Sequence, residues 1–302
     1  SNSELDDLVI LRADGSHTYN FCVVVDDYDM GITHVLRGDD HLNNTPRQIN
    51  ILQALGCTPP VYAHLPMILG SDGAKLSKRT GAASVMEYRD AGYLPQAVLN
   101  YLARLGWSHG DQEIFSLAEL VQLFDGTHLQ KAAGAINPDK LLWLNQHYFK
   151  TLPLESIAEQ AQWHLTTQGL DVSSGAPFTA VIDAQRERVK TLVELVQASR
   201  YFYEAPSAYD EKAASKNLTA DAVPFLQALH TTYSTCAWDK ETVHEAIKTI
   251  AEQHGVGMGK VAQPLRVALT GNTASPPMDV TVFLIGREAV LARITRALGF
   301  IA

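Results

Sequence analysis

The sequence has few cysteines, no long apolar segment and fewer basic than acidic residues, and each shortage excludes a class of protein. Its 302 residues include three cysteines, Cys22, Cys57 and Cys236, which form no Cys-x-x-Cys pair. Neither a zinc site nor a disulfide framework is therefore predicted. No apolar run approaches the roughly 20 residues that cross a bilayer, and the polar, acidic first residues do not form a signal peptide. We expect a cytoplasmic protein with reduced thiols and no membrane partner.

The charge balance excludes a protein that coats nucleic acid indiscriminately. There are 24 Lys and Arg against 33 Asp and Glu, which gives a net charge of -9. Specific contact through local basic patches stays open. One patch, at 186–190, reads Arg-Glu-Arg-Val-Lys. It is either a solvated helix face or a binding site.

The first 85 residues have the pattern of an α/β unit. Aromatic and β-branched runs predict strands at 19–25, 32–36 and 65–69. A helix is predicted to start at Thr45-Pro46 and to end before Gly56. Strands that alternate with helices favour a parallel sheet, with ligands at the carboxyl ends of the strands.

From about Ser84 the pattern becomes helical. Apolar residues at helical spacing predict helices at 95–106, 116–123 and 138–145, and further amphipathic segments continue to the end. Breaks at 171–177 and 204–217 separate groups of helices. The chain thus reads as a partial α/β unit followed by more than two hundred mostly helical residues. The partial unit has few strands for a free-standing sheet, and we expect that its front has been removed.

The most informative stretch is Lys75-Leu76-Ser77-Lys78-Arg79, which gathers two ammoniums, a hydroxyl and a guanidinium. The turn-forming residues 70–74 come directly before it, so these donors are predicted to lie on a surface loop. Several positive donors at one point suit a polyphosphate whose charge builds up during reaction. A solvated basic turn is the alternative.

Arg37 follows the predicted strand at 32–36 and therefore projects where ligands of a parallel sheet lie. Its planar fork matches a carboxylate with two parallel hydrogen bonds. His41 could stack on a ring or cap the following helix, and Tyr19 could offer its hydroxyl to a substrate or belong to the core. The alternative for Arg37 is an ion pair with one of three nearby carboxylates: Asp26, Asp27 or Asp39.

Together these blocks resemble bacterial glutamyl-tRNA synthetase, a class I aminoacyl-tRNA synthetase. The first block runs from Tyr19 to Gln48 and includes Arg37-Gly38 and Asp40-His41-Leu42-Asn43-Asn44-Thr45-Pro46; the second is Leu65-Pro66-Met67-Ile68-Leu69. The basic loop is similar to the family's Lys-Met-Ser-Lys-Ser signature. Leu76 and Arg79 depart from that generic form, and the glutamyl branch commonly has Arg at the last position. The likeness covers essentially the whole chain.

The resemblance implies the following domains and site residues. Residues 1–84 would be the carboxyl-terminal part of a Rossmann-like catalytic domain, 85–150 a stem-contact domain, and 151–217 and 218–302 two helical anticodon-binding domains. Lys78, with Lys75 and Ser77 on the same loop, would be catalytic. The ATP-binding residues would be Lys78, Asp39, Asp40, His41, Met67 and Ile68. Tyr19 and Arg37 would bind glutamate. The candidates for tRNA contact are Arg200, Tyr201, Arg266 and Arg293.

The implied activity is the ligation of L-glutamate to tRNA-Glu through a glutamyl-adenylate. The implied partners are ATP with Mg²⁺, the acceptor stem and the anticodon. No metal ligands are expected in the chain, and the full-length protein would be a monomer.

The family's first signature, His-x-Gly-His, does not occur in the sequence. We therefore expect a carboxyl-terminal portion of the enzyme that is inactive by itself, and the alternative is a non-catalytic tRNA-binding module. A third possibility is a truncated paralogue that modifies tRNA with only the catalytic half. Such proteins lack the helical anticodon region, so its presence here speaks against this alternative.

Overall fold

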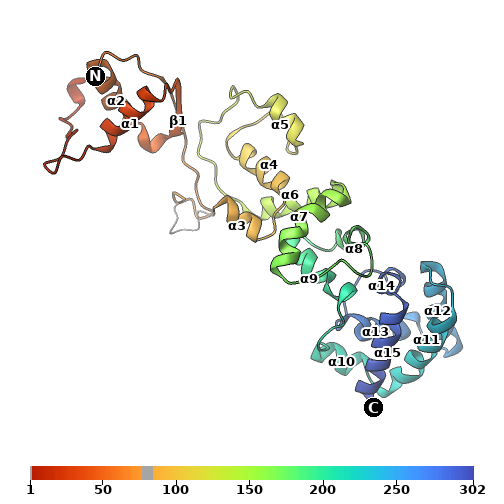
Figure 1. Ribbon diagram of the computed structural model, residues 1–302. Coiled ribbons are helices and arrows are strands. Elements are labelled where there is room, and N and C mark those ends of the chain that lie inside the picture. Colours follow the sequence, from red (N-terminus) through yellow and green to blue (C-terminus); the bar gives the residue numbers. More distant parts are fainter. Residues whose placement is uncertain (1, 77–83) are drawn as a thin grey trace. The chain divides into compact units, whose positions relative to one another are not determined.

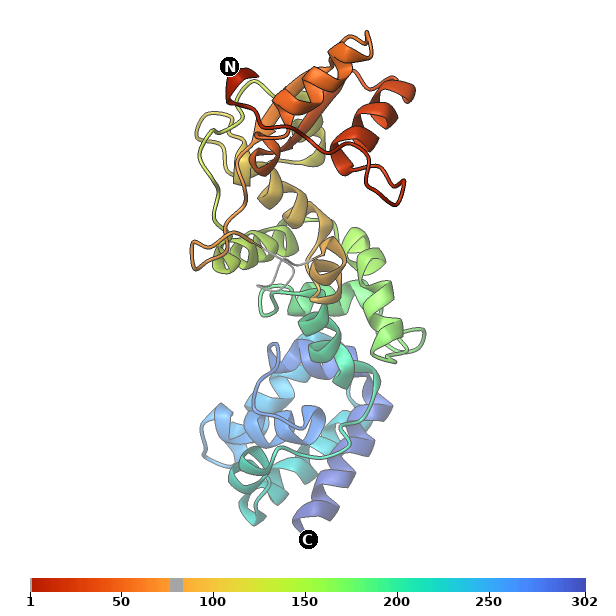
Figure 2. The ribbon, with the colours of Figure 1, turned by 90° about the vertical axis from the view of Figure 1, so that its left-hand side faces the viewer.

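The computed structural model describes residues 2–76 and 84–302 and divides into two compact units (Figures 1 and 2). The first unit comprises residues 1–83 and 99–138, and the second comprises 84–98 and 139–302. Helices dominate the described residues, as expected. None of the described helices combines the length and the apolar character needed to cross a membrane.

The first unit is built on a β-α-β arrangement. Strand β1 (His34–Gly38) leads through α2 (Thr45–Ala54) to β2 (Val61–Leu65), and the two strands pair in parallel. The predicted helix at Thr45-Pro46 and the predicted parallel pairing are thus confirmed. The register sets Arg37 opposite His64, so both residues lie at the carboxyl ends of their strands. A short 3-10 helix, η2 (Asp39–His41), follows β1 directly.

The strand predicted at 19–25 is wrong, because these residues form the first part of helix α1 (Tyr19–Asp29). A run of valines and aromatics satisfies strand propensity, but propensity is readily overridden by packing. Here Val24 is buried, α1 packs against α2, and the Asn20 side chain accepts a hydrogen bond from the buried Gln48 amide at 2.9 Å. The contact with α2 therefore selects the helix.

The strand predicted at 65–69 lies too late in the sequence. Strand β2 ends at Leu65, and Pro66 lacks the N–H group that a continued ladder would need. Leu69 instead forms two isolated bridges, an antiparallel one to Lys75 and a parallel one to Ala135. The basic loop therefore starts from a hairpin that the segment around Ala135 supports.

The rest of the first unit gathers around Trp107, which is fully buried. It contains most of α4 (Pro95–Gly106) and α5 (Leu117–Leu123), both near their predicted positions. The Trp107 ring lies 5.4 Å from the ring centroids of both Phe115 and Phe124. This aromatic cluster is the core that joins α4, α5 and the loops between them.

The second unit is entirely helical in its described residues. Its early helices are α3 (Val85–Asp90), α6 (Pro138–Thr151), α7 (Leu154–Thr167), α8 (Phe178–Gln185) and α9 (Leu192–Tyr203). Its later elements are α10 (Glu211–Asn217), η3 (Ala220–Ala222), α11 (Val223–Thr235), α12 (Lys240–Gln253), α13 (Met258–Thr270), α14 (Met278–Ile285) and α15 (Arg287–Ile301). Helices α7, α8 and α9 pack together, while α11 contacts α12 and α15, and α13 contacts both of these (Figures 1 and 2).

Gly92, which follows α3, allows its segment to pack directly against the start of α9. Its carbonyl accepts a hydrogen bond from Leu192 N at 2.8 Å, and its φ is +85°. A Cβ at this position would lie 2.6 Å from Val193 N, so only glycine permits the contact. The segment is held again by the buried Asn145 side chain, which accepts from Leu94 N and donates to Lys190 O.

Candidate functional site

The centre of the first candidate site is the Arg37 side chain at the end of β1. Its Nη2 donates to Thr45 Oγ1 at 2.8 Å, and its guanidinium carbon lies 5.2 Å from the centroid of the Tyr62 ring. The Thr45 hydroxyl lies 2.9 Å from His64 Nε2 on the neighbouring strand. These contacts orient the guanidinium, while its buried Nε has no hydrogen-bond partner among the described residues.

No carboxylate in the described part of the chain forms an ion pair with Arg37, so the alternative considered for it from the sequence is not realised. Asp27 lies close enough to Arg37 for the guanidinium charge to affect its carboxyl. Burial raises the pKa of the Asp27 carboxyl, and the Arg37 charge opposes that rise. The guanidinium is therefore positioned by neutral partners and keeps its capacity for a ligand carboxylate.

Tyr19 and His41 meet beside this residue. The Tyr19 hydroxyl lies 3.4 Å from His41 Nδ1, and the two ring centroids are 5.8 Å apart. Asn44 Nδ2 lies 3.3 Å from the same imidazole nitrogen. The Tyr19 side chain is 51% exposed, so the alternative that it belongs to the core does not hold. The structure thus brings Tyr19 against His41, and Thr45, which accepts from Arg37, lies 3.3 Å from the His41 carbonyl.

Asp40 and Lys75 form the link between this cluster and the basic loop. Lys75 Nζ lies 3.3 Å from Asp40 Oδ2, and both side chains are about half exposed. The hydrogen bond from Lys75 lowers the pKa of the Asp40 carboxyl. A Cβ placed on Gly38 would lie 2.6 Å from Asp40 Oδ1 and 3.2 Å from Met67 Sδ, so Asp40 and Met67 approach the same backbone. Exposed ion pairs contribute little stability, and Lys75 can leave Asp40 for a phosphate at small cost.

The remaining predicted residues of this site are more scattered. Asp39 is exposed at the start of η2, and its carbonyl accepts from Leu42 N. Ile68 accepts from Leu76 N through its carbonyl, and its side chain lines an apolar cavity of about 250 Å³ with Trp107 and Phe124. Ser77 and Lys78 lie outside the described residues. The described residues contain no group of three or more potential metal ligands.

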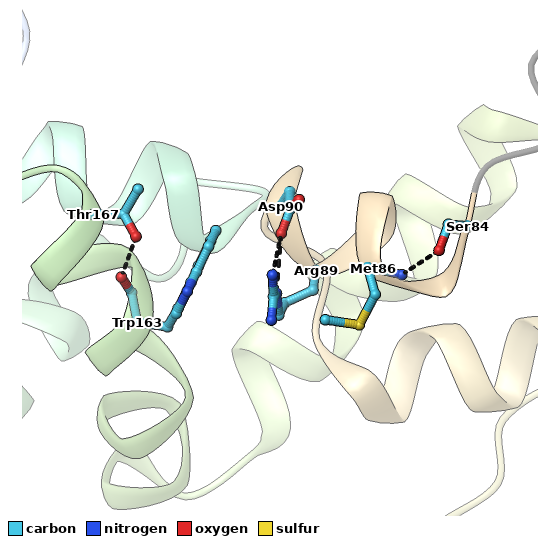
Figure 3. Close-up of polar contacts among 6 residues, drawn as sticks. All are labelled: Ser84, Met86, Arg89, Asp90, Trp163 and Thr167. Carbon is cyan, nitrogen blue, oxygen red and sulfur yellow. Dashed lines mark hydrogen bonds and ion pairs between the residues drawn. The ribbon is translucent and has the colours of Figure 1, made fainter.

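Helix α3 begins directly after its N-cap residue, Ser84. Ser84 Oγ accepts from Met86 N, and Arg89 donates twice to Asp90 Oδ1, at 2.8 and 3.0 Å. Figure 3 shows the Arg89 guanidinium bonded to Asp90 and beside the Trp163 ring, whose centroid is 4.3 Å away. This cation–π contact fixes α3 on α7.

A second candidate site is a cavity of about 400 Å³ in the helical unit, between α8, α9 and the segment after α13. It is lined by Gln185, Arg188, Val189, Gln197, Ala198, Tyr201, Thr270, Asn272, Ala274 and Ser275. Arg266 does not line the cavity itself, but its Nε donates at 3.0 Å to the hydroxyl of the lining residue Ser275. Burial lowers the pKa of Arg266, and the charge of Arg188 lowers it further. Arg188 lines the cavity, and Arg266 is close enough for the two charges to repel, so this side favours a ligand rich in hydrogen-bond acceptors.

Tyr201 and Arg266 are thus brought together at this cavity, and the other two predicted tRNA contacts are not. Arg200 donates to Glu204 Oε2 and to Gln168 O, both at 2.7 Å. Arg293 is only 5% exposed and donates to the carbonyls of Tyr201 and Leu269. Both arginines are engaged by the protein.

The sequence did not single out Arg188 as a site residue, although it belongs to the basic patch at 186–190. The neighbouring Arg186 forms an ion pair with Asp183 at 3.1 Å, whereas Arg188 lines the cavity. The available signal was the patch itself. Choosing between its members required knowing where α8 ends.

Comparisons with known proteins cover both regions. Residues 1–143 match the family model of class I tRNA synthetases (E and Q), catalytic domain, and residues 156–298 match the model of an anticodon binding domain. A crystal structure of a glutamate tRNA ligase from Elizabethkingia meningosepticum in complex with its amino acid is 32% identical, with a TM-score of 0.83 over 99% of this chain. The glutamate-tRNA synthetase of Elizabethkingia anophelis is 33% identical, with a TM-score of 0.77 over 98% of this chain. The chain spans 63% of the length of each of these two proteins.

Proposed function

This chain belongs to the class I tRNA synthetases (E and Q), and we propose that it serves the ATP-dependent ligation of L-glutamate to tRNA-Glu. The observation that carries the proposal is the cluster at the carboxyl ends of β1 and β2. There Thr45 orients Arg37 and also contacts the His41 carbonyl, Tyr19 lies against His41, and Asp40 pairs with Lys75. The neighbour from Elizabethkingia meningosepticum, solved with its amino acid, supports glutamate as the substrate.

In this proposal each side of the cluster binds one part of a glutamyl-adenylate. Arg37 and Tyr19 hold the glutamate. Lys75, with Ser77 and Lys78 on the same loop, neutralises charge on the phosphates of ATP, for which positioned cations are well suited. The adenosine end is bound by five residues: Asp39, Asp40, His41, Met67 and Ile68. Mg²⁺ enters with the phosphates of ATP as part of the substrate, because it usually keeps several waters and few protein ligands.

The helical part binds the tRNA. We assign contact with the acceptor stem to residues 85–150 and contact with the anticodon to two domains, 151–217 and 218–302. We further propose that the full-length protein is a monomer in the cytoplasm. Anticodon bases are single-stranded and can be splayed, stacked on aromatic rings and hydrogen-bonded by arginine. The cavity lined by Arg188 and Tyr201, with Arg266 behind it, supplies these groups within one site.

A non-catalytic tRNA-binding module is the second candidate for this polypeptide alone. It is favoured by the sequence, which contains no His-x-Gly-His. In this family that signature holds the triphosphate opposite the lysine loop. We propose that the chain binds tRNA without activating glutamate by itself.

Two assays on the chain test the proposal. Filter binding should show tRNA-Glu affinity that falls as salt rises, because phosphate contacts release counterions. Glutamate-dependent pyrophosphate exchange, with tRNA-Glu added, should show no turnover. Salt-insensitive binding, or equal affinity for unrelated RNA, would contradict the tRNA assignment. Robust exchange would refute the proposed inactivity and leave the ligase assignment in place.

A further inference from the structure

The Tyr201 side of the cavity between α8, α9 and α13 is held by two residues that we infer to be positioning residues, Arg293 and Gln185. They fix the cavity in the shape that discriminates one anticodon base from another. This inference rests on the proposed function, because it concerns how the tRNA site is shaped. Neither residue needs to touch the RNA. Each acts through Tyr201.

Arg293 reaches two helix ends with one nitrogen. Its Nη1 donates to Tyr201 O at 2.6 Å and to Leu269 O at 2.8 Å. Tyr201 lies in the last turn of α9, and Leu269 lies in the last turn of α13. The carbonyls at a helix end lack partners within the helix and attract a cation. Arg293 on α15 therefore joins α9 to α13 at a point where both helices need a donor.

The two carbonyls belong to segments that both contribute to the cavity. Tyr201 lines it from α9, while Thr270, the residue after Leu269, lines it from the end of α13. One guanidinium, which is 5% exposed, thus ties these two cavity-lining segments together. Burial lowers the pKa of Arg293 to about 10, so the side chain keeps its charge at neutral pH.

Gln185 holds the other end of Tyr201. Its Nε2 donates to the Tyr201 hydroxyl oxygen at 2.9 Å and to Ala198 O at 2.7 Å. An amide nitrogen has two hydrogens, and both are used here. Gln185 is 2% exposed and lines the cavity, so it has no amide hydrogen left for a ligand. The phenol oxygen accepts from Gln185, which leaves its own hydrogen free to donate into the site.

A base contact depends on the direction of its hydrogen bonds, whereas a phosphate contact depends mainly on charge. Loss of either positioning residue should therefore damage discrimination between anticodons more than general affinity for RNA. A residue that merely supports the fold would lower affinity for every tRNA alike.

The test measures dissociation constants of the chain for tRNA-Glu and for the same tRNA with its anticodon replaced. Three variants are compared with the wild type: Arg293→Lys, Arg293→Met and Gln185→Leu. The matched control is Arg287→Lys. Arg287 is also on α15 and donates to two carbonyls, Ser234 O and Cys236 O, which do not line the cavity.

Discrimination is the dissociation constant for the tRNA with the replaced anticodon divided by that for tRNA-Glu. We expect Arg293→Met and Gln185→Leu to reduce this ratio by roughly tenfold, the size of one lost base contact. Arg293→Lys should recover part of the ratio, because its ammonium can still donate to a carbonyl. The salt dependence of binding and the control variant should be unchanged. If Arg293→Met does not fold, as judged by circular dichroism, Arg293→Lys and Gln185→Leu decide the matter.

Two results would overturn the inference alone: a wild-type ratio in Gln185→Leu and Arg293→Lys, or an equal loss for both tRNAs. A wild type that binds tRNA without distinguishing anticodons would overturn the proposed anticodon site, and this inference with it.

Discussion

Replacing Arg188 and Arg266 together by methionine should weaken binding of tRNA-Glu by roughly two orders of magnitude, since each well-placed arginine contact contributes about 1–3 kcal/mol. Arg188 lines the cavity beside Tyr201, Arg266 donates to the lining residue Ser275, and the charge of Arg188 contributes to the lowered pKa of Arg266. Acceptor groups of the RNA would relieve that repulsion. The measurement is a filter-binding titration at fixed salt with the single and double variants.

The matched control is Arg186→Met in the same basic patch. Arg186 forms its ion pair with Asp183 and does not line the cavity, so its loss should change the affinity less than about twofold. An equal effect of Arg186→Met would show that the patch acts only through its total charge. Wild-type affinity in the double variant would exclude the cavity as a tRNA site.

Replacing Trp107 by alanine should destabilise the first unit by about 3–5 kcal/mol, the usual cost of removing a fully buried Trp side chain. The ring is the common neighbour of Phe115 and Phe124, so its loss leaves a cavity between α4 and α5. Hydrogen exchange should show faster opening of residues 99–138. Residues 223–301 should exchange as in the wild type, because their core belongs to the other unit.

Trp143→Ala provides the comparison for this prediction. Trp143 lies on α6 and is 52% exposed, so its removal should cost less than about 1 kcal/mol. If the two variants lost equal stability, the Trp107 cluster would not be the core of the first unit. Uniformly faster exchange over both units in Trp107→Ala would show that they do not unfold separately.

Much of the helical architecture followed from the sequence, because apolar spacing and end signals agree there. The helix at 45–54 has Pro46 in its first turn and Gly56, with φ +74°, just past its end. The strand prediction for residues 19–25 was wrong because a short run of valines and aromatics fits a strand or a helix equally well. The contact of Gln48 with Asn20 decides between them, and it joins residues 28 positions apart.

The candidate sites were predictable to different degrees. Arg37 was predicted at a strand end because that is a local signal, and β1 does place it opposite His64. The residues that line the cavity beside Tyr201 come from α8, α9 and the end of α13 with the segment after it, and they span 90 positions from Gln185 to Ser275. Sequence alone therefore did not separate Arg188, which faces the cavity, from Arg293, whose carbonyl partners lie in two other helices.

The most direct test of the central claim is a calorimetric titration of the chain with a non-hydrolysable glutamyl-adenylate analogue. This ligand carries no pyrophosphate, so it probes the Arg37 side of the site without the His-x-Gly-His signature. Binding should be saturable in the wild type and at least about tenfold weaker in Arg37→Met, which loses a charged hydrogen-bond donor. Absence of binding, or equal affinity in both proteins, would contradict a glutamate site at the end of β1.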